Sequence, residues 1–163
     1  MDQPIKMPHI NVQIREGKRE DVPQVMGLIH ALAEYEKASE EVLNTAEQLA
    51  EDGFGPNPLY GLYVAEAQDR IVGMALFFYR YSTWKGKTLY LEDLYVQPQY
   101  RKQKIGKALL DVLVERARQE NCQRLHWQVL DWNESAIQFY KSLGSTLDGE
   151  WINVYLDTPA KST

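Results

Sequence analysis

Cysteine is almost absent from this 163-residue sequence, in which Cys122 stands alone. An internal disulfide is therefore excluded, and a reducing, cytoplasmic setting is expected. A lone cysteine can be a reactive thiol, but a half-buried bystander is the commoner case. Long apolar runs are missing as well. The longest, residues 71–79, is too short to span a bilayer, and the opening MDQP lacks the regions of a signal peptide, so no membrane association is expected.

Positive charge is in deficit, and the net charge of −5 argues against a general nucleic-acid binder. The two signs are also unevenly spread. Residues 34–52 hold seven acids and a single base, whereas residues 97–110 hold four bases and no acid. The first region favours a cation and the second a polyanion, unless both are simply solvated faces. The acids are Glu34, Glu36, Glu40, Glu41, Glu47, Glu51 and Asp52, and the bases are Arg101, Lys102, Lys104 and Lys107.

No repeat or low-complexity segment interrupts the chain, which indicates one mixed α/β (α+β) domain over 1–163, with 1–9 and 157–163 as flexible ends. Apolar and β-prone residues predict strands near 10–15, 60–67, 71–80, 88–96, 124–130 and 151–156. Helical spacing predicts helices over 22–33, 105–117 and 133–143, and Thr45 opens a further short helix. Short turns join the strands near 60–96, so they should form an antiparallel meander.

The most informative segment is residues 90–107, YLEDLYVQPQYRKQKIGK. A strand ends at Val96, a basic loop follows, and a helix begins near Ile105. Amide groups at a helix N-terminus are unpaired and carry partial positive charge, so this loop can hold a pyrophosphate. Strand–loop–helix junctions also contain glycine and lysine for solubility alone, and the pattern by itself does not separate the two readings.

This segment resembles motif A of the GNAT superfamily of N-acetyltransferases, Arg/Gln-x-x-Gly-x-Gly/Ala. Arg101 and Gly106 match, whereas Lys104 stands where the first glycine is expected. We expect the cradle to survive, because its donors are main-chain amides that lysine also has. The resemblance implies acetyl-CoA as co-substrate and no metal. It assigns the pantetheine arm to Leu94, Tyr95 and Val96, and the pyrophosphate to Arg101, Lys102, Gln103, Lys104, Ile105, Gly106 and Lys107. Asn133 and Ser135 match further cofactor contacts, although either could simply cap the last helix.

Within the superfamily the chain looks most like the diamine (spermidine/spermine) N-acetyltransferases and the related thialysine N-acetyltransferases. The segments that carry this likeness are 52–55 (DGFG), 79–87 (YRYSTWKGK), 89–96 (LYLEDLYV) and 132–141 (WNESAIQFYK). The likeness implies a GNAT fold, with a mostly antiparallel, twisted sheet of six to seven strands flanked by about four helices. It also implies a homodimer with acceptor sites near the interface.

The resemblance also supplies catalytic roles. An alkylammonium with a pKa of roughly 10.4 must lose a proton before its nitrogen can attack a thioester. Glu92 matches the position that collects this proton, and a surface carboxylate is the plainer alternative. Tyr140 matches the general acid that protonates the leaving thiolate while also contacting the cofactor, and its alternative is a core tyrosine. The amides of the pantetheine-binding strand can polarise the acyl carbonyl.

The acceptor amine is assigned to Tyr35 and Glu36 on the first helix and to Glu92. His126, Trp127 and Gln128 should line the far wall of that site, although Trp127 suits a core position nearly as well. The family has Glu-Gly-Trp near the C-terminus, whereas this chain reads DGEW over 148–151.

The resemblance therefore implies direct acetyl transfer, in a ternary complex, to a primary amine of a small cationic acceptor of the diamine or polyamine type. An amino-acid-like amine such as thialysine is the alternative acceptor. A non-catalytic acyl-CoA sensor is an alternative of another class. A nucleotide-binding module is disfavoured, because no Gly-x-Gly-x-x-Gly or P-loop pattern occurs.

Overall fold

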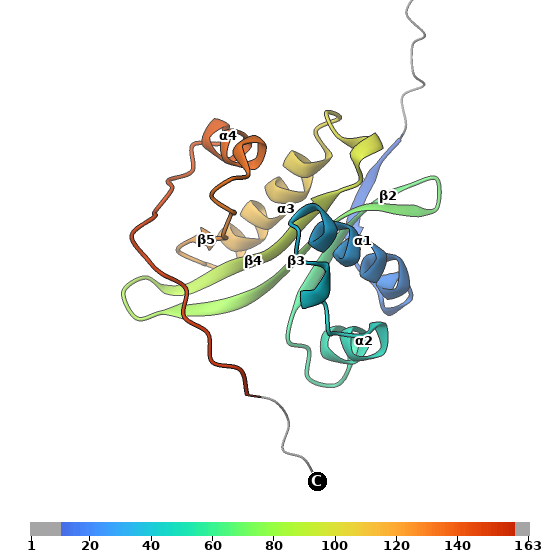
Figure 1. The fold of residues 1–163 in the computed structure, drawn as a ribbon, viewed down its shortest axis with the longest axis horizontal. Coiled ribbons are helices and arrows are strands. Elements are labelled where there is room, and N and C mark those ends of the chain that lie inside the picture. The colour runs from blue at the N-terminus through green and yellow to red at the C-terminus, as the bar shows by residue number, and fades with distance from the viewer. Residues whose placement is uncertain (1–10, 159–163) are drawn as a thin grey trace, which may run out of the picture. The chain divides into compact units, whose positions relative to one another are not determined.

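The computed structural model describes residues 11–158, which divide into two compact units at residue 128. The first unit is built on one five-stranded sheet in the order β1-β2-β3-β4-β5 (Figure 1). Its strands are β1 (Gln13–Glu16), β2 (Gly61–Ala67), β3 (Arg70–Ser82), β4 (Gly86–Val96) and β5 (Leu125–His126). The first four strands are antiparallel neighbours, which confirms the predicted meander, and β5 runs parallel to β4.

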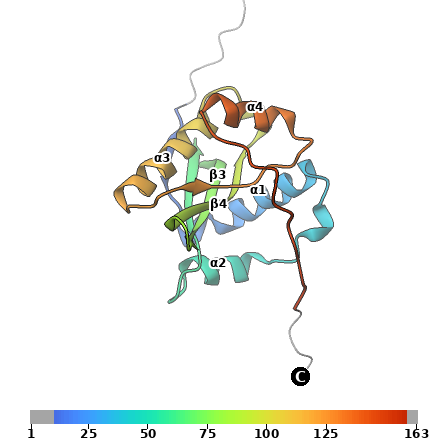
Figure 2. The ribbon, with the colours of Figure 1, turned by 90° about the vertical axis from the view of Figure 1, so that its left-hand side faces the viewer.

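Three helices cover the two faces of this sheet: α1 (Val22–Tyr35), α2 (Ala46–Phe54) and α3 (Ile105–Gln119). Apolar residues of α1 and α2 pack with Met74 and Leu76 of β3 in one buried cluster. The opposite face meets α3, whose Arg116 guanidinium lies 5.1 Å from the centre of the Phe77 ring. Figure 2 shows α1 and α3 on opposite sides of β3 and β4. None of the helices in the described residues is both long and apolar enough to cross a membrane.

Local sequence explains where these helices begin. The Thr45 hydroxyl accepts the amide of Gln48 at 3.1 Å, so the predicted cap of α2 is present. In α3 the apolar stripe Ile105, Leu109 and Leu113 is buried, as helical spacing requires. Asp21 differs from expectation, because its carboxylate accepts the Lys18 amide at 2.7 Å and thereby caps a preceding 3-10 turn instead of α1.

The second unit, described from 129 to 158, contains the helix α4 (Glu134–Ser142). The Asn133 side chain accepts the Ala136 amide at 3.3 Å and so caps this helix. Gly144 follows the helix with a φ of 78°, which a glycine adopts at little cost.

The expected six to seven strands are a wrong count, because the described residues form five. The segment near 124–130 pairs only at two residues, and the predicted strand near 151–156 forms no strand. Its apolar side chains, including Trp151, Ile152 and Tyr155, are exposed. An alternating pattern shows that a segment suits a sheet, whereas a strand also needs a paired neighbour. The expectation of one domain stays a prediction, and the ends expected to be flexible lie outside the described residues apart from 157 and 158.

Candidate active site

A one-residue bulge in β4 places two acidic side chains on the same face of the sheet. Leu76 of β3 pairs with Asp93 of β4, but the next residue, Phe77, pairs with Leu91, so Glu92 is the extra residue. Strict alternation would turn the side chains of Glu92 and Asp93 to opposite faces. The bulge resets this alternation, and Asp93 shares the face of Leu76, which is the face that α1 and α2 cover.

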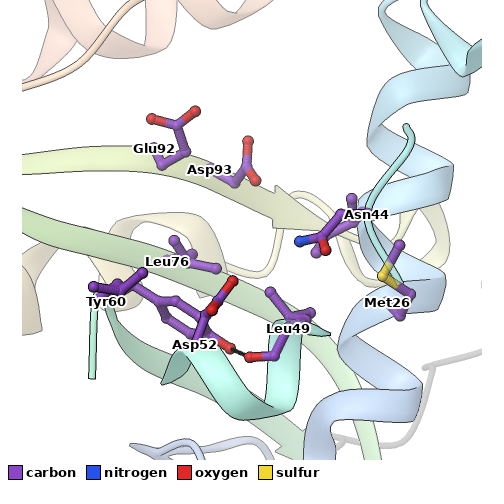
Figure 3. A pocket seen from close by; sticks show the side chains of 10 residues that line it. Met26, Asn44, Leu49, Asp52, Tyr60, Leu76, Glu92 and Asp93 are labelled. Carbon is purple, nitrogen blue, oxygen red and sulfur yellow. Dashed lines mark hydrogen bonds between the residues drawn. The ribbon is translucent and has the colours of Figure 1, made fainter. Parts of the chain in front are cut away.

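A pocket of about 270 Å³ lies on this face, and both acids line it (Figure 3). This volume is slightly below the roughly 300–1,000 Å³ of common ligand pockets, so it suits a small molecule. Five of the ten lining residues are apolar, and the five polar ones can fix the orientation of a ligand. The lining consists of Met26, Ile29, Leu49, Leu59 and Leu76 together with Asn44, Asp52, Tyr60, Glu92 and Asp93.

The electrostatics of this pocket favour a cation. The pKa of Asp93 is raised to about 6, first by burial and then by the negative charges of Glu92 and Glu36. Burial also raises the pKa of Glu36, which follows the last residue of α1. Because neighbouring negative charges and lost hydration both disfavour a buried carboxylate, a bound ammonium would relieve this cost. Asp93 was not predicted from the sequence, although it stands beside Glu92.

The other residues expected at the acceptor site are not in the lining of this pocket. Tyr35 ends α1, and the Arg101 guanidinium lies 5.4 Å from the centre of its ring. His126 pairs with Tyr90 across β4 and β5, and its Nδ1 lies 3.3 Å from a nitrogen of the Arg80 guanidinium. Trp127 and Gln128 follow directly after β5. Among the residues expected to bind the acceptor, the pocket therefore contains Glu92, while Glu36 acts on it through its charge.

The basic loop before α3 has two residues in an uncommon backbone conformation. Lys102 and Lys104 have φ angles of 62° and 63°, in the left-handed region that favours glycine, and Lys104 is the N-cap of α3. Gly106 leaves open space, since a side chain there would meet only Val96, at 3.9 Å. Arg101 turns back, and its Nε donates to the Val96 carbonyl at 2.9 Å. Lys107 forms an ion pair with Asp111 at 2.6 Å. Arg101 and Lys107 therefore each bind a neighbouring group of the protein.

The edge of β4 beside this loop is open. β5 pairs with β4 only at Leu89 and Tyr90, so the part of β4 that includes Leu94, Tyr95 and Val96 has no strand neighbour on that side among the described residues. Main-chain groups on such an edge are available to an extended ligand.

In the second unit, the residues expected to act on the cofactor lie on and just before α4. Tyr140 is half-buried, with its ring 5.4 Å from that of Phe139, and its carbonyl accepts the Ser145 hydroxyl at 2.8 Å. Ser135 is exposed in the first turn, next to the capping Asn133. Cys122 of the first unit is half-buried, and burial raises the pKa of its thiol. A raised pKa makes the thiol less reactive, as expected of a cysteine without a catalytic role.

Solved structures with this fold include acetyltransferases. An aminoglycoside acetyltransferase from an uncultured soil metagenomic sample superposes with a TM-score of 0.74 and 19% identity, over 91% of this chain and 97% of the other. An integron cassette protein of V. cholerae gives a TM-score of 0.74 at 25% identity, over 90% and 93% of the two chains. At 19% identity, the likeness to the aminoglycoside acetyltransferase shows only that the two chains share a fold. That fold is one that acetyltransferases use.

Sequence comparison assigns the family. The model of the acetyltransferase (GNAT) family matches residues 26–144, and the chain therefore belongs to this family of N-acetyltransferases. The thialysine N-epsilon-acetyltransferase of Bos taurus is 44% identical over 142 residues, which are 82% of this chain and 84% of the relative. A human spermidine/spermine N(1)-acetyltransferase-like protein is 37% identical over 140 residues, 82% of this chain and 20% of the relative. The expectation of an acetyltransferase is thereby confirmed.

Proposed function

We propose that this protein transfers an acetyl group from acetyl-CoA to a primary amine of a small cationic acceptor of the diamine or polyamine type. The observation that carries this proposal is the apolar pocket in which the β4 bulge sets Glu92 beside Asp93. The names of the similar proteins put their reactions on a nitrogen of thialysine or of spermidine and spermine. Acetyl transfer to a nitrogen of a small amine is what these names share.

The first step is loss of a proton from the bound ammonium. Its pKa of roughly 10.4 in water leaves little free amine at neutral pH, so a nearby carboxylate is needed. Glu92 takes this proton, directly or through water, beside Asp93, whose pKa the charge of Glu92 helps to raise. A pKa of about 6 at Asp93 is close to the range that suits a base near neutral pH.

The second step forms the amide bond. The amine nitrogen attacks the acyl carbon, the carbon–sulfur bond breaks, and the Tyr140 hydroxyl gives its proton to the departing thiolate. The proton that the nitrogen loses on becoming an amide returns, directly or through water, to the Tyr140 oxygen. No enzyme nucleophile is required, and the half-buried Cys122, whose pKa is raised, is poorly suited to be one. The reaction is therefore a direct transfer within a ternary complex.

The co-substrate would lie along the open edge of β4 and at the start of α3. Amides in the stretch 94–96 would bind the pantetheine arm and polarise the acyl carbonyl. The loop 101–107 would hold the pyrophosphate through main-chain amides, which its left-handed residues Lys102 and Lys104 help to orient. Asn133 and Ser135 would add contacts from the second unit. A homodimer in the cytoplasm completes the proposal and rests on the family resemblance and the single cysteine.

The test is consumption of acetyl-CoA by the purified chain with 1,4-diaminobutane, spermidine or thialysine, followed as free thiol, with the product identified by mass spectrometry. The expected result is thiol release that depends on the amine and yields an N-acetylated product. Calorimetric binding of acetyl-CoA without turnover of any amine would favour the sensor instead. A preference for an uncharged or anionic amine would refute the diamine or polyamine acceptor while leaving acetyl transfer in place.

A further inference from the structure

The pocket has a third carboxylate, Asp52, on an element other than β4. Asp52 lies near the C-terminal end of α2, whereas Glu92 and Asp93 belong to β4 (Figure 3). Apolar side chains, among them Leu49 and Leu76, line the same pocket. The negative charge is thus held on two elements that share an apolar lining, and none of the ten lining residues is a lysine or arginine.

Asp52 is held in place by its own helix. The side-chain amide of Gln48, one turn earlier, donates to Asp52 Oδ1 at 2.8 Å, and the Asp52 carbonyl accepts the Leu59 amide at 2.7 Å. These contacts leave Oδ2 without a hydrogen-bond donor among the described residues. A carboxylate fixed through one oxygen, with the other available, is organised to accept a bond from a ligand.

Tyr60, the other acidic side chain in this part of the lining, does not compete for that role. Its hydroxyl donates to the Leu49 carbonyl at 2.6 Å. Burial and then the charge of Asp52 raise the pKa of Tyr60 to about 12, so the phenol stays neutral. Asp52 is therefore the anionic group on the α2 side of the pocket.

We propose that Asp52 binds the second, non-reacting ammonium group of the acceptor and so sets a preference for diamines over monoamines. The inference rests on the proposed function, in which the reacting nitrogen lies at Glu92 and Asp93. An aliphatic segment between two cationic ends would cover the apolar lining while each end meets a carboxylate. A monoamine would satisfy the β4 acids and leave Asp52 unpaired.

The test compares kcat/KM for 1,4-diaminobutane and n-butylamine, which differ only in the second amine. In Asp52→Asn the ratio of the two kcat/KM values should fall about tenfold, equivalent to ~1.4 kcal/mol. Asparagine keeps the carbonyl oxygen that accepts from Gln48, so the fold should be retained, and thermal unfolding checks this. The matched control is Glu51→Gln, which removes a neighbouring charge that pairs with Arg19 at 3.3 Å, outside the pocket. Its ratio should stay within about twofold of that of the wild type.

A second variant, Asp52→Glu, keeps the charge but moves it one methylene further along the side chain. It should shift the preference toward 1,3-diaminopropane, and this result does not depend on Asp52→Asn being folded. Calorimetry with 1,4-diaminobutane adds a readout apart from turnover, since Asp52→Asn should bind it about tenfold more weakly than the wild-type protein.

Three results would overturn the inference: a wild-type enzyme indifferent to the second amine, an unchanged ratio in Asp52→Asn, or an equal fall in Glu51→Gln. Failure of the proposed function would look different. In that case the wild-type protein would release no thiol from acetyl-CoA with any amine.

Discussion

Asp93→Asn should make the protein more stable at neutral pH, although it removes a charge from the proposed site. The pKa of the half-buried Asp93 is raised from 3.8 to about 6 by burial, by Glu92 and by Glu36. The folded state therefore holds this proton more tightly than the unfolded state. As pH rises from about 4 to above 6, ionisation of Asp93 costs about 3 kcal/mol of folding free energy. Asparagine has no proton to lose and avoids that cost.

The expected gain thus depends on pH, being close to zero near pH 4 and up to about 3 kcal/mol at pH 7. At about 2–4 °C per kcal/mol for a domain of this size, the melting temperature at pH 7 should rise by up to about 6–12 °C. Urea unfolding across this pH range measures the same difference as a free energy. Glu41→Gln, at an exposed position, controls for the loss of one negative charge.

A stability difference that is the same at every pH would refute the reasoning, as would a variant less stable than wild type at pH 7. The amide should also weaken turnover, because a proton acceptor is replaced by a neutral group. Such an exchange of stability for activity is typical of residues kept for function.

Other substitutions test the remaining assignments. Tyr140→Phe should lower kcat at least about tenfold while acetyl-CoA binding stays within a few-fold, since one hydroxyl and little packing are lost; near-normal turnover would remove Tyr140 from the mechanism. Lys104→Gly should be tolerated or should tighten CoA binding in calorimetry, because a φ of 63° suits glycine; a loss of binding would show that the lysine side chain contacts the ligand. KM for a cationic amine should rise with ionic strength, as the Debye length falls from about 10 Å at 0.1 M to about 3 Å at 1 M, and should rise in Glu36→Gln with little change in kcat; indifference to salt would argue against a charged acceptor. Glu92→Gln should instead depress kcat, most strongly below the pKa of the amine, and an unchanged kcat would exclude Glu92 as the base.

Much of the fold follows from periodicity in the sequence. The stripe from Ile105 to Ala117 predicts α3, because residues three and four apart share a helix face, and those residues are buried. The β2–β3–β4 meander follows from apolar strands joined by short turns. The predicted strand near 151–156 does not form, although its side chains alternate as in a strand. An alternating pattern does not say which other segment, if any, will pair with it through hydrogen bonds.

The basic loop shows a different limit. The motif marks Lys104 as a departure from glycine, yet the chain adopts the left-handed conformation there and at Lys102 as well. Left-handed backbone costs a non-glycine residue on the order of 1 kcal/mol, which the surrounding structure must offset. The residue types of the loop therefore do not reveal its backbone conformation, because a lysine can adopt the left-handed conformation that a glycine was expected to supply.

The acidic pair of the pocket depends on a feature that residue identity alone does not specify. Resemblance singles out Glu92, and the two-residue period of a strand would turn the Asp93 side chain to the opposite face, toward α3. One unpaired residue in the ladder reverses that outcome and brings both acids to the face of α1 and α2. Bulges are common next to active sites because they re-aim a side chain at the cost of one ladder position. If the bulge has that role here, deleting the extra residue, Glu92, should do more than remove one carboxylate. With Glu92 removed, Leu91 stays opposite Phe77 and Asp93 stays opposite Leu76, so the remaining residues keep their faces while the local bend of the bulge is lost. Turnover should then be abolished, whereas Glu92→Gln, which keeps the bulge, should only reduce it.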